Sequence, residues 1–456
     1  MREIRESADG RSNEAPLGGA ERRLFTSMAS AQFRWLFVSN TIFFLAMGGQ
    51  QVLRSWLVFD LTGSELALGL ISAVVAVPML VISPLGGAAA DRFDRRALIA
   101  AGQAAVVLSE VAILVLLYTG ALHFWHLLVL AGIMGSVFPF IMPARQAIVA
   151  DVVGRRRLTN AMALNMAAVN TTRILGPAAA GFLIGAIGVG PSYGINAGLY
   201  LAALAALLVG VRSSRAAAQS TLGVWARVAE GFRYVVRERL VGLLLVFGLL
   251  PMFLVMPFQS LLVVFAEDIW EKGPQGLGIL SAASGLGGVV GAIYVAWLGN
   301  SGGRLRTMLS SSVACGLLLF AFALSPSFLL AVPLVFAASV AVNVYSALNN
   351  TAIQVLIPDE VRGRVSSFLM MSFSLPLLGV LPISAVAESV GAPAAVAGAS
   401  VLAALASVSF YASSPTLRSL DRQLERCAAA AEATPVAGVT AAPGPAPAAP
   451  EGPRGG

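Results

Sequence analysis

Long apolar stretches alternate with short polar breaks along the sequence from Leu36 to Tyr411. Each stretch holds about twenty residues with few charges, the length that a helix needs to cross a bilayer. Strands of a membrane barrel would instead alternate weakly over about ten residues. The pattern therefore predicts an all-α polytopic membrane protein with about twelve transmembrane helices. The expected spans are 36–59, 66–90, 97–119, 124–146, 160–187, 191–211, 240–266, 275–299, 305–324, 328–353, 365–388 and 393–412.

The composition agrees with this class and excludes an ordinary soluble domain. Apolar residues make up 57% of the chain and charged residues 12%, whereas soluble domains hold about 45–50% and about 25%. Residues 1–35 are polar and arginine-rich and lack the cleavage pattern of a signal peptide, so we expect a cytoplasmic N-terminal tail. Residues 414–456 become polar and then rich in alanine and proline, which predicts a disordered cytoplasmic tail.

Basic residues fall almost entirely in alternate breaks between the expected spans. The breaks on one side hold the loop arginines, whereas those on the other side hold only Lys272, beside three acidic residues. Because cytoplasmic loops of membrane proteins are enriched in lysine and arginine, we expect both termini in the cytoplasm. The net charge of +7 then follows from this topology, and no nucleic-acid partner is expected.

An internal repeat divides the chain into two halves. The segment LGLISA at 68–73 reappears as LGILSA at 277–282, 209 residues later. The segment QAIVADVVGRRR at 146–157 reappears as QVLIPDEVRGRV at 354–365, 208 residues later. An even number of spans separates the copies, so the halves are parallel repeats about an axis along the membrane normal. The repeat predicts two six-helix bundles, 36–211 and 240–413.

A cytoplasmic linker, 212–239, joins the two predicted bundles. Its apolar residues follow helical spacing from Leu222 to Val236, and arginines occupy the other faces. This pattern is typical of a basic amphipathic helix at a membrane surface. The helix is either a spacer between the bundles or a regulatory site.

Several motifs together resemble those of the major facilitator superfamily. The first is Gly87-xxx-Asp91-Arg92-x-x-Arg95-Arg96, between the second and third spans. Others narrow the resemblance to the bacterial exporter branch that contains the enterobactin exporter and the transmembrane secretion effector family. They are Asp60-Leu-Thr-Gly-Ser64, Glu230-Gly-Phe-Arg-Tyr234, Leu158-Thr-Asn-Ala161 and Arg173-Ile-Leu-Gly-Pro177.

The resemblance implies a transporter in which two bundles rock about a central site. Spans 1, 4, 7 and 10 would line the cavity, and spans 2, 5, 8 and 11 would form the interface between the bundles. Asp91 would contact the start of span 11 in one state only, and Arg95 would pair with Asp151. The sequence departs from the superfamily at Asp94, where glycine is usual, and at Asn300, the repeat position of Asp91. We therefore expect this state-dependent contact, a latch between the halves, in the first repeat only.

Ionisable residues inside a bilayer cost about 2.5–3.5 kcal/mol each, so each one needs a physical reason. Arg54 shares a helical stripe with Asn40 and Gln51, which suits a cavity face that binds substrate or a counter-ion. The alternative is an arginine that reaches to the outer membrane surface. Arg173 lies one turn before Gly176-Pro177 and the later Gly181, a run that resembles the antiporter motif of the superfamily. It predicts a hinge or leak-tight contact, or ordinary tight packing.

Glu110 is the acidic residue that lies well inside a predicted span. A carboxylate buried there could carry a coupling proton or make a structural polar contact. Asp60 and Glu388, near outer span ends, are alternative residues for proton access. The arginine that proton antiporters of this superfamily usually carry in the middle of span 4 is missing, and Arg145 lies near the cytoplasmic end of that span.

Uncharged polar residues on two further spans are candidates for substrate contacts. They accompany several phenylalanines, a combination that suits a bulky amphipathic or aromatic solute. These candidates are Gln259 on span 7 and Asn343, Ser346, Asn350 and Gln354 on span 10.

The first functional hypothesis is proton-coupled export of a drug-like or siderophore-like small molecule by alternating access. An importer or a lipid or metabolite flippase of the same fold is the alternative, because fold does not determine function. An enzyme or ATP-driven pump is rejected, since Lys272 is the single lysine and no phosphate-binding loop exists. With only His123 and His126 as histidines, we expect no metal and no cofactor. We expect a monomer in the inner or plasma membrane of a bacterium.

Overall fold

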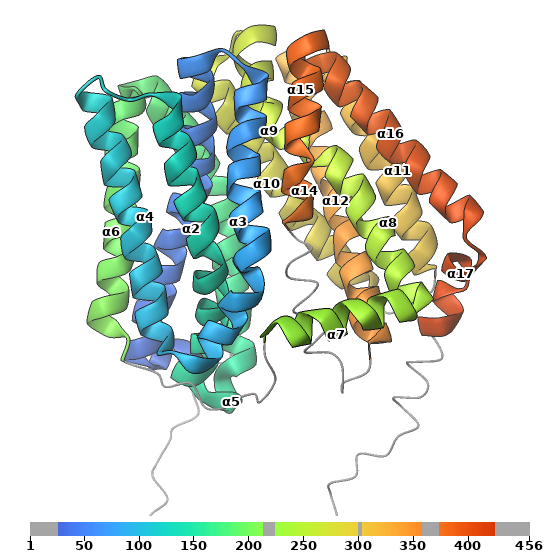
Figure 1. Cartoon of the computed structure of the whole chain (residues 1–456), viewed down its shortest axis with the longest axis horizontal. Helices are drawn as coiled ribbons and strands as arrows, with labels where there is room; N and C mark the ends of the chain where they lie inside the picture. The colour runs from blue at the N-terminus through green and yellow to red at the C-terminus, as the bar shows by residue number, and fades with distance from the viewer. Residues whose placement is uncertain (1–25, 213–223, 300–302, 358–373, 425–456) are drawn as a thin grey trace, which may run out of the picture.

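The computed structural model describes residues 26–212, 224–299, 303–357 and 374–424, and nearly all of them are helical (Figure 1). Ten helices in this part of the chain are long and apolar enough to cross a membrane. Two further expected spans, 160–187 and 365–388, correspond to the second part of a long helix and to a shorter apolar segment, Leu375–Val390. The predicted all-α polytopic fold with two bundles is confirmed.

The N-terminal half contains five long helices. A short helix, η1 (Thr26–Ala29), precedes them. The helices are α2 (Ala31–Thr62), α3 (Glu65–Arg92), α4 (Arg95–Tyr118), α5 (Phe124–Ile187) and α6 (Val189–Gly210). Helix α5 holds both the fourth and the fifth expected spans. It turns between them at Gly154, whose φ of 68° favours glycine.

The C-terminal half repeats this arrangement with more interruptions. Pro257 lacks a backbone N–H and begins a new helix, so the seventh expected span is divided into three pieces. The elements are α8 (Arg239–Val255), α9 (Pro257–Val264), the π-helix η2 (Phe265–Ile269), α10 (Gly273–Leu298), α11 (Arg304–Ala323), α12 (Phe328–Leu356), α14 (Leu375–Leu378), α15 (Val380–Val390) and α16 (Ala392–Ser413).

The predicted linker helix is present as α7 (Val224–Arg237). It contacts α3 of the N-terminal half and α8 of the C-terminal half. Figure 1 shows it lying across one end of the molecule, nearly perpendicular to the long helices. The turn between α3 and α4, with Arg92, Arg95 and Arg96, lies at this end, which we call the arginine-rich end.

The folded structure extends into both predicted tails, 1–35 and 414–456. Ser27 is buried and its backbone N–H donates to Asn160 Oδ1 at 3.1 Å, so residues 26–35 belong to the folded bundle. After α16, the chain forms α17 (Pro415–Arg418) and a further helical turn. Leu417, Leu420 and Leu424 are buried there in the apolar cluster of the C-terminal half. The prediction of disorder from 414 onward is therefore wrong for residues 414–424, because three leucines at helical spacing supply a buried face.

The two halves meet along two helix pairs. Helix α3 packs against α15, and α5 packs against α10. These are the second, eleventh, fifth and eighth spans, the pairing that the resemblance implies. Small residues allow the close approach: a Cβ added to Gly278 would lie 2.9 Å from the Cα of Gly181.

The apolar core shows at which end the halves are joined. Away from the arginine-rich end, one buried cluster includes Leu57 of α2 together with Phe258 of α9 and Leu277 of α10. Near the arginine-rich end, the buried clusters of the described residues stay within one half, around Ile99 or around Leu305. In Figure 1 the two bundles approach each other at the upper end and diverge toward α7.

Candidate functional site

The charged turn between α3 and α4 holds four helices of the N-terminal half together. Arg95 Nη1 lies 2.6 Å from Asp151 Oδ2 on α5, and Arg95 Nε donates to the carbonyl of Ala90 at 3.2 Å. The Arg95–Asp151 pairing that the resemblance implies is therefore present. Arg96 Nη2 donates to the carbonyl of Leu208 on α6 at 2.6 Å.

Asp94, which replaces the usual glycine of the superfamily, has a structural role in this turn. Its Oδ1 accepts from the backbone N–H of Ala97 at 2.7 Å and caps the N-terminus of α4. In the C-terminal half, Asp421 beyond α16 accepts from the backbone N–H of Leu305 at 3.2 Å, at the start of α11. The second repeat has thus acquired its capping acid from a different part of the chain.

Asp91 and Arg92 are exposed at the end of α3. The start of span 11, which Asp91 is predicted to contact, lies outside the described residues. Gly87 has open space around its Cα, whereas a Cβ added to Gly86 would collide with the backbone of Pro139 on α5. The close approach in this motif is therefore made by Gly86 rather than by Gly87.

The polar candidates of α2 differ in how deeply they are buried. Asn40 is buried and its Nδ2 donates to Asn165 Oδ1 on α5 at 3.0 Å, while Gln51 is exposed. Arg54 is partly buried and interacts electrostatically with Glu110 of α4. Asn40 and Arg54 thus face the interior of the N-terminal bundle.

Arg145 on α5 is a buried charged residue, although the sequence pattern places it near the cytoplasmic end of its span. Only 3% of it is exposed, and its guanidinium lies 4.1 Å from the ring centroid of Phe43, a cation–π arrangement. Nη1 donates to Asn40 Oδ1, whereas Nε and Nη2 have no hydrogen-bond partner among the described residues. Nine residues separate Arg145 from the turn at Gly154, which places it about 13 Å inside the bundle.

Glu110 is fully buried, with 0% of its surface exposed. Gln50 Nε2 of α2 donates to Glu110 Oε1, and Asn196 Nδ2 of α6 donates to Glu110 Oε2 at 3.2 Å. The hydroxyl of Tyr200 donates to Gln50 Oε1 at 2.7 Å. Residues from α2, α4 and α6 therefore form one hydrogen-bonded group, which we call the Glu110 network.

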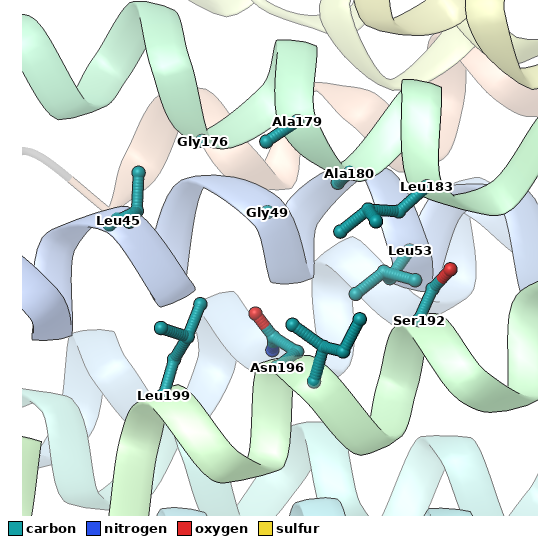
Figure 2. Close-up of a pocket in the computed structure, with 11 residues that line it drawn as sticks. Leu45, Gly49, Leu53, Gly176, Ala179, Ala180, Leu183, Ser192, Asn196 and Leu199 are labelled. Atoms are coloured by element: carbon teal, nitrogen blue, oxygen red, sulfur yellow. The ribbon is translucent and has the colours of Figure 1, made fainter. Parts of the chain in front are cut away.

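A small cavity adjoins the Glu110 network. It is lined by α2, α5 and α6, and Figure 2 shows the Asn196 side chain pointing from α6 toward Gly49 of α2 at its edge. Asn196 therefore belongs both to the lining of the cavity and to the network. The remaining lining residues are mostly small or aliphatic.

The span-five motif forms two close contacts. A Cβ added to Gly176 would lie 2.7 Å from the carbonyl oxygen of Leu45 on α2, so Gly176 and the buried Pro177 allow α5 to pack closely against α2. Gly181 packs against Gly278 across the halves. Arg173 is exposed. A Cβ added to Gly285 of α10 would collide with the backbone carbonyl of Arg173, so α5 and α10 also pack closely here. The geometry favours a tight interfacial contact for this motif.

The polar candidates of the C-terminal half have different environments. Asn343 packs against Gly288 of α10, and its Nδ2 donates to the carbonyl of Ser339 in its own helix at 3.0 Å. This contact is structural. Four other candidates keep accessible surface: Gln259, Ser346 and Asn350 are partly buried, and Gln354 is exposed.

Glu388 joins the two halves at the end opposite the arginines. Its Oε2 accepts from Ser64 Oγ at 2.9 Å and from the backbone N–H of Leu66 at 3.0 Å, at the N-terminus of α3. A carboxylate is favoured there by the helix dipole. Asp60 lies exposed near the same end of α2.

The sequence profile of the transmembrane secretion effector family matches residues 23–438. The chain therefore belongs to this family of the major facilitator superfamily. It is 27% identical over 347 residues to the multidrug efflux pump Tap of Mycolicibacterium fortuitum, covering 74% of this chain and 84% of Tap. It is 23% identical over 349 residues to macrolide efflux protein A of Streptococcus pyogenes, covering 75% of this chain and 86% of that protein.

Solved structures confirm the major facilitator fold. The nucleoside transporter NupG aligns with a TM-score of 0.68 at 14% identity, over 83% of this chain and 99% of NupG. A bacterial homologue of the human lysosomal transporter Spinster, solved in an inward-facing conformation, aligns with a TM-score of 0.63 at 16% identity, over 90% of this chain and 99% of that one. The protein is thus a multi-pass membrane transporter.

Proposed function

We propose that this protein is a proton-coupled exporter of bulky, drug-like or siderophore-like small molecules in the plasma membrane of a bacterium. The observation that carries the proposal is the similarity to two efflux proteins, one for multiple drugs and one for macrolides, along about three quarters of the chain. The exposed and partly buried polar residues of α9 and α12 suit contacts with such a solute, which is largely apolar with a few polar groups.

The arrangement of the halves supports alternating access. The halves share one apolar cluster at the end opposite the arginines, while the clusters at the arginine-rich end are separate. With the arginines in the cytoplasm, according to the positive-inside rule, this state faces inward and both termini are cytoplasmic. Substrate would then be loaded from the cytoplasm and released outside after the bundles rock.

The two ends of the α3–α15 pair carry one acid each. Glu388, at the end of α15, caps the start of α3 in this state. Asp91, at the opposite end of α3, is the acid expected to cap the start of span 11. The rocking motion separates one end as it closes the other, so the two contacts would alternate. Each would stabilise one state by up to about 1 kcal/mol at an exposed site.

Efflux from cells tests this function. The full chain is expressed in a bacterium that lacks its own efflux pumps, and accumulation of ethidium and erythromycin is followed with and without an uncoupler. We expect lower accumulation in expressing cells and loss of this difference when the uncoupler collapses the proton gradient. Equal accumulation of both probes with and without the protein would contradict drug export. Transport that persists unchanged in the uncoupler would contradict proton coupling.

A further inference from the structure

We propose that Glu110 is the residue that binds the coupling proton, inside the N-terminal bundle rather than at the boundary between the halves. This inference rests on the proposed proton coupling. Glu110 lies about 22 Å along α4 from the arginine-rich end, deep within the membrane span. The Gly181–Gly278 contact that joins the halves lies on other helices, α5 and α10.

The hydrogen bonds around Glu110 are arranged for an ionised carboxylate. Both of its oxygens accept from amide N–H groups, one of Gln50 and one of Asn196. The Tyr200 hydroxyl donates to Gln50 Oε1 and so holds the Gln50 amide with its N–H groups toward Glu110. A glutamine at position 110 would have met the packing needs of this site without the cost of a charge in the bilayer.

The charged and titratable groups around Glu110 come from three helices. Arg54 of α2 interacts with it electrostatically, and Tyr193 and Tyr200 face it from α6. Arg145 of α5 lies beyond Tyr200, with which it interacts. Arg54 is thus the cation among these groups that interacts with the acid itself, and it favours the ionised form without a direct salt bridge among the described residues.

Protonation would rearrange the network in a defined way. The proton comes from the aqueous phase and forms an O–H bond on one carboxylate oxygen, and no other covalent bond changes. That oxygen then needs an acceptor, and Gln50 Oε1 becomes available if the Gln50 amide rotates. Tyr200 would lose its acceptor in this step. Its ring makes an edge contact with Phe43, the ring that lies beneath Arg145, so the change reaches α5 through packed side chains.

Buried polar atoms that lack partners mark the surroundings of this network. Among the described residues, the Tyr193 hydroxyl, both amide atoms of Gln103 and two nitrogens of Arg145 have no hydrogen-bond partner. Gln103 lies two helical turns below Glu110 on the same face of α4, toward the arginine-rich end. Such groups are normally satisfied by ordered water. Gln103 and Arg145 lie between the arginine-rich end and Glu110, so water bound at their unpaired atoms would give protons a route to the acid.

Infrared spectroscopy of the full-length protein in lipid measures this proton directly. During a pH titration, wild-type protein should show a carboxylic-acid C=O band that is absent in Glu110→Gln. The band should remain in Asp60→Asn and Glu388→Gln, which remove the other candidate acids. Tyr200→Phe should shift the pH midpoint of the band, because it releases the Gln50 amide. Ser109→Ala is the matched control on α4, since Ser109 Oγ donates to the carbonyl of Ala105 in its own helix and takes no part in the Glu110 network of the described residues.

Transport by the same variants separates this inference from the proposed function. In vesicles with an imposed pH gradient, Glu110→Gln should lose gradient-driven erythromycin transport while retaining erythromycin exchange at the wild-type level. Exchange also shows that the variant is folded. Gradient-driven transport by Glu110→Gln equal to the wild type, or an unchanged infrared band, would overturn the inference and leave proton-coupled export intact. Wild-type transport at the same rate with and without the pH gradient would overturn the proposed coupling. The infrared band would still decide whether Glu110 binds a proton.

Discussion

Gly181 and Gly278 meet backbone to backbone across the boundary between the two halves of the transporter. A Cβ added to Gly278 would lie 2.9 Å from the Cα of Gly181 and 3.3 Å from the carbonyl oxygen of Pro177. Gly278 occupies the repeat position of Gly69, which packs equally closely on Leu381 and Ser384 of α15. The repeat has therefore preserved a glycine at each of the two close contacts between the halves.

Gly278→Val should impair transport strongly. The added side chain cannot fit between α5 and α10, and overpacking of this kind costs about 1–3 kcal/mol. We expect a lower Tm in detergent and loss of drug efflux. Gly198→Val on α6 is the control, because a Cβ there meets no atom within 4 Å. Full efflux by Gly278→Val would show that the close contact is not needed for the motion.

Glu388→Gln should weaken the closed state of the end opposite the arginines. Loss of the charge at the N-terminus of α3 removes about 0.3–1 kcal/mol, or a population shift of about twofold to fivefold. Spin labels on the exposed residues Leu61 and Val390 would report the distance between the halves. We expect a larger fraction of long distances in the variant. Asp60→Asn serves as the control, and an unchanged distribution in Glu388→Gln would argue against a latch.

Asp91→Asn should reduce transport while leaving insertion and orientation unchanged. The three arginines of the turn, which set topology, remain in this variant, whereas the acid that would cap span 11 is lost. Efflux and protease accessibility of the loops would be measured together. Asp91→Glu keeps the charge and should retain activity. Normal efflux by Asp91→Asn would indicate that the turn sets topology and that its acid has no role in transport.

Sequence patterns predicted the spans well because a helix that crosses the apolar core of a bilayer needs about twenty apolar residues. The helix boundaries differ by a few residues where caps decide them: Ser30 accepts from Phe33 N–H and starts α2 at Ala31, not at 36. The leucines at 417, 420 and 424 carried a helical signal, which the polar composition of the segment concealed. The pairing of Arg95 with Asp151 followed from the resemblance alone.

The Glu110 network could not be predicted in the same way. Glu110 was recognised as a buried acid, but its partners Gln50 and Asn196 lie on helices that are distant along the chain. Only the packing of α2, α4 and α6 brings them together. Single polar residues in apolar helices are the signal that the sequence offers. The pattern places Arg145 near the end of its span, whereas the helix continues to the turn at Gly154. The hydrogen bond of Asn40 to Asn165 on α5 likewise depends on the packing of two helices.

The direct test of proton-coupled export follows protons and substrate together. Purified full-length protein is placed in vesicles that are loaded with erythromycin and a pH-sensitive dye, and the vesicles are diluted into drug-free buffer. Outward movement of erythromycin should acidify the lumen, and a proton ionophore should abolish this change. Because antiport exchanges the two solutes in opposite directions, the sign does not depend on how the protein is oriented. Because erythromycin is a weak base whose neutral form can leak out, protein-free vesicles supply the baseline. Erythromycin release that acidifies the lumen no more than in protein-free vesicles would contradict the account.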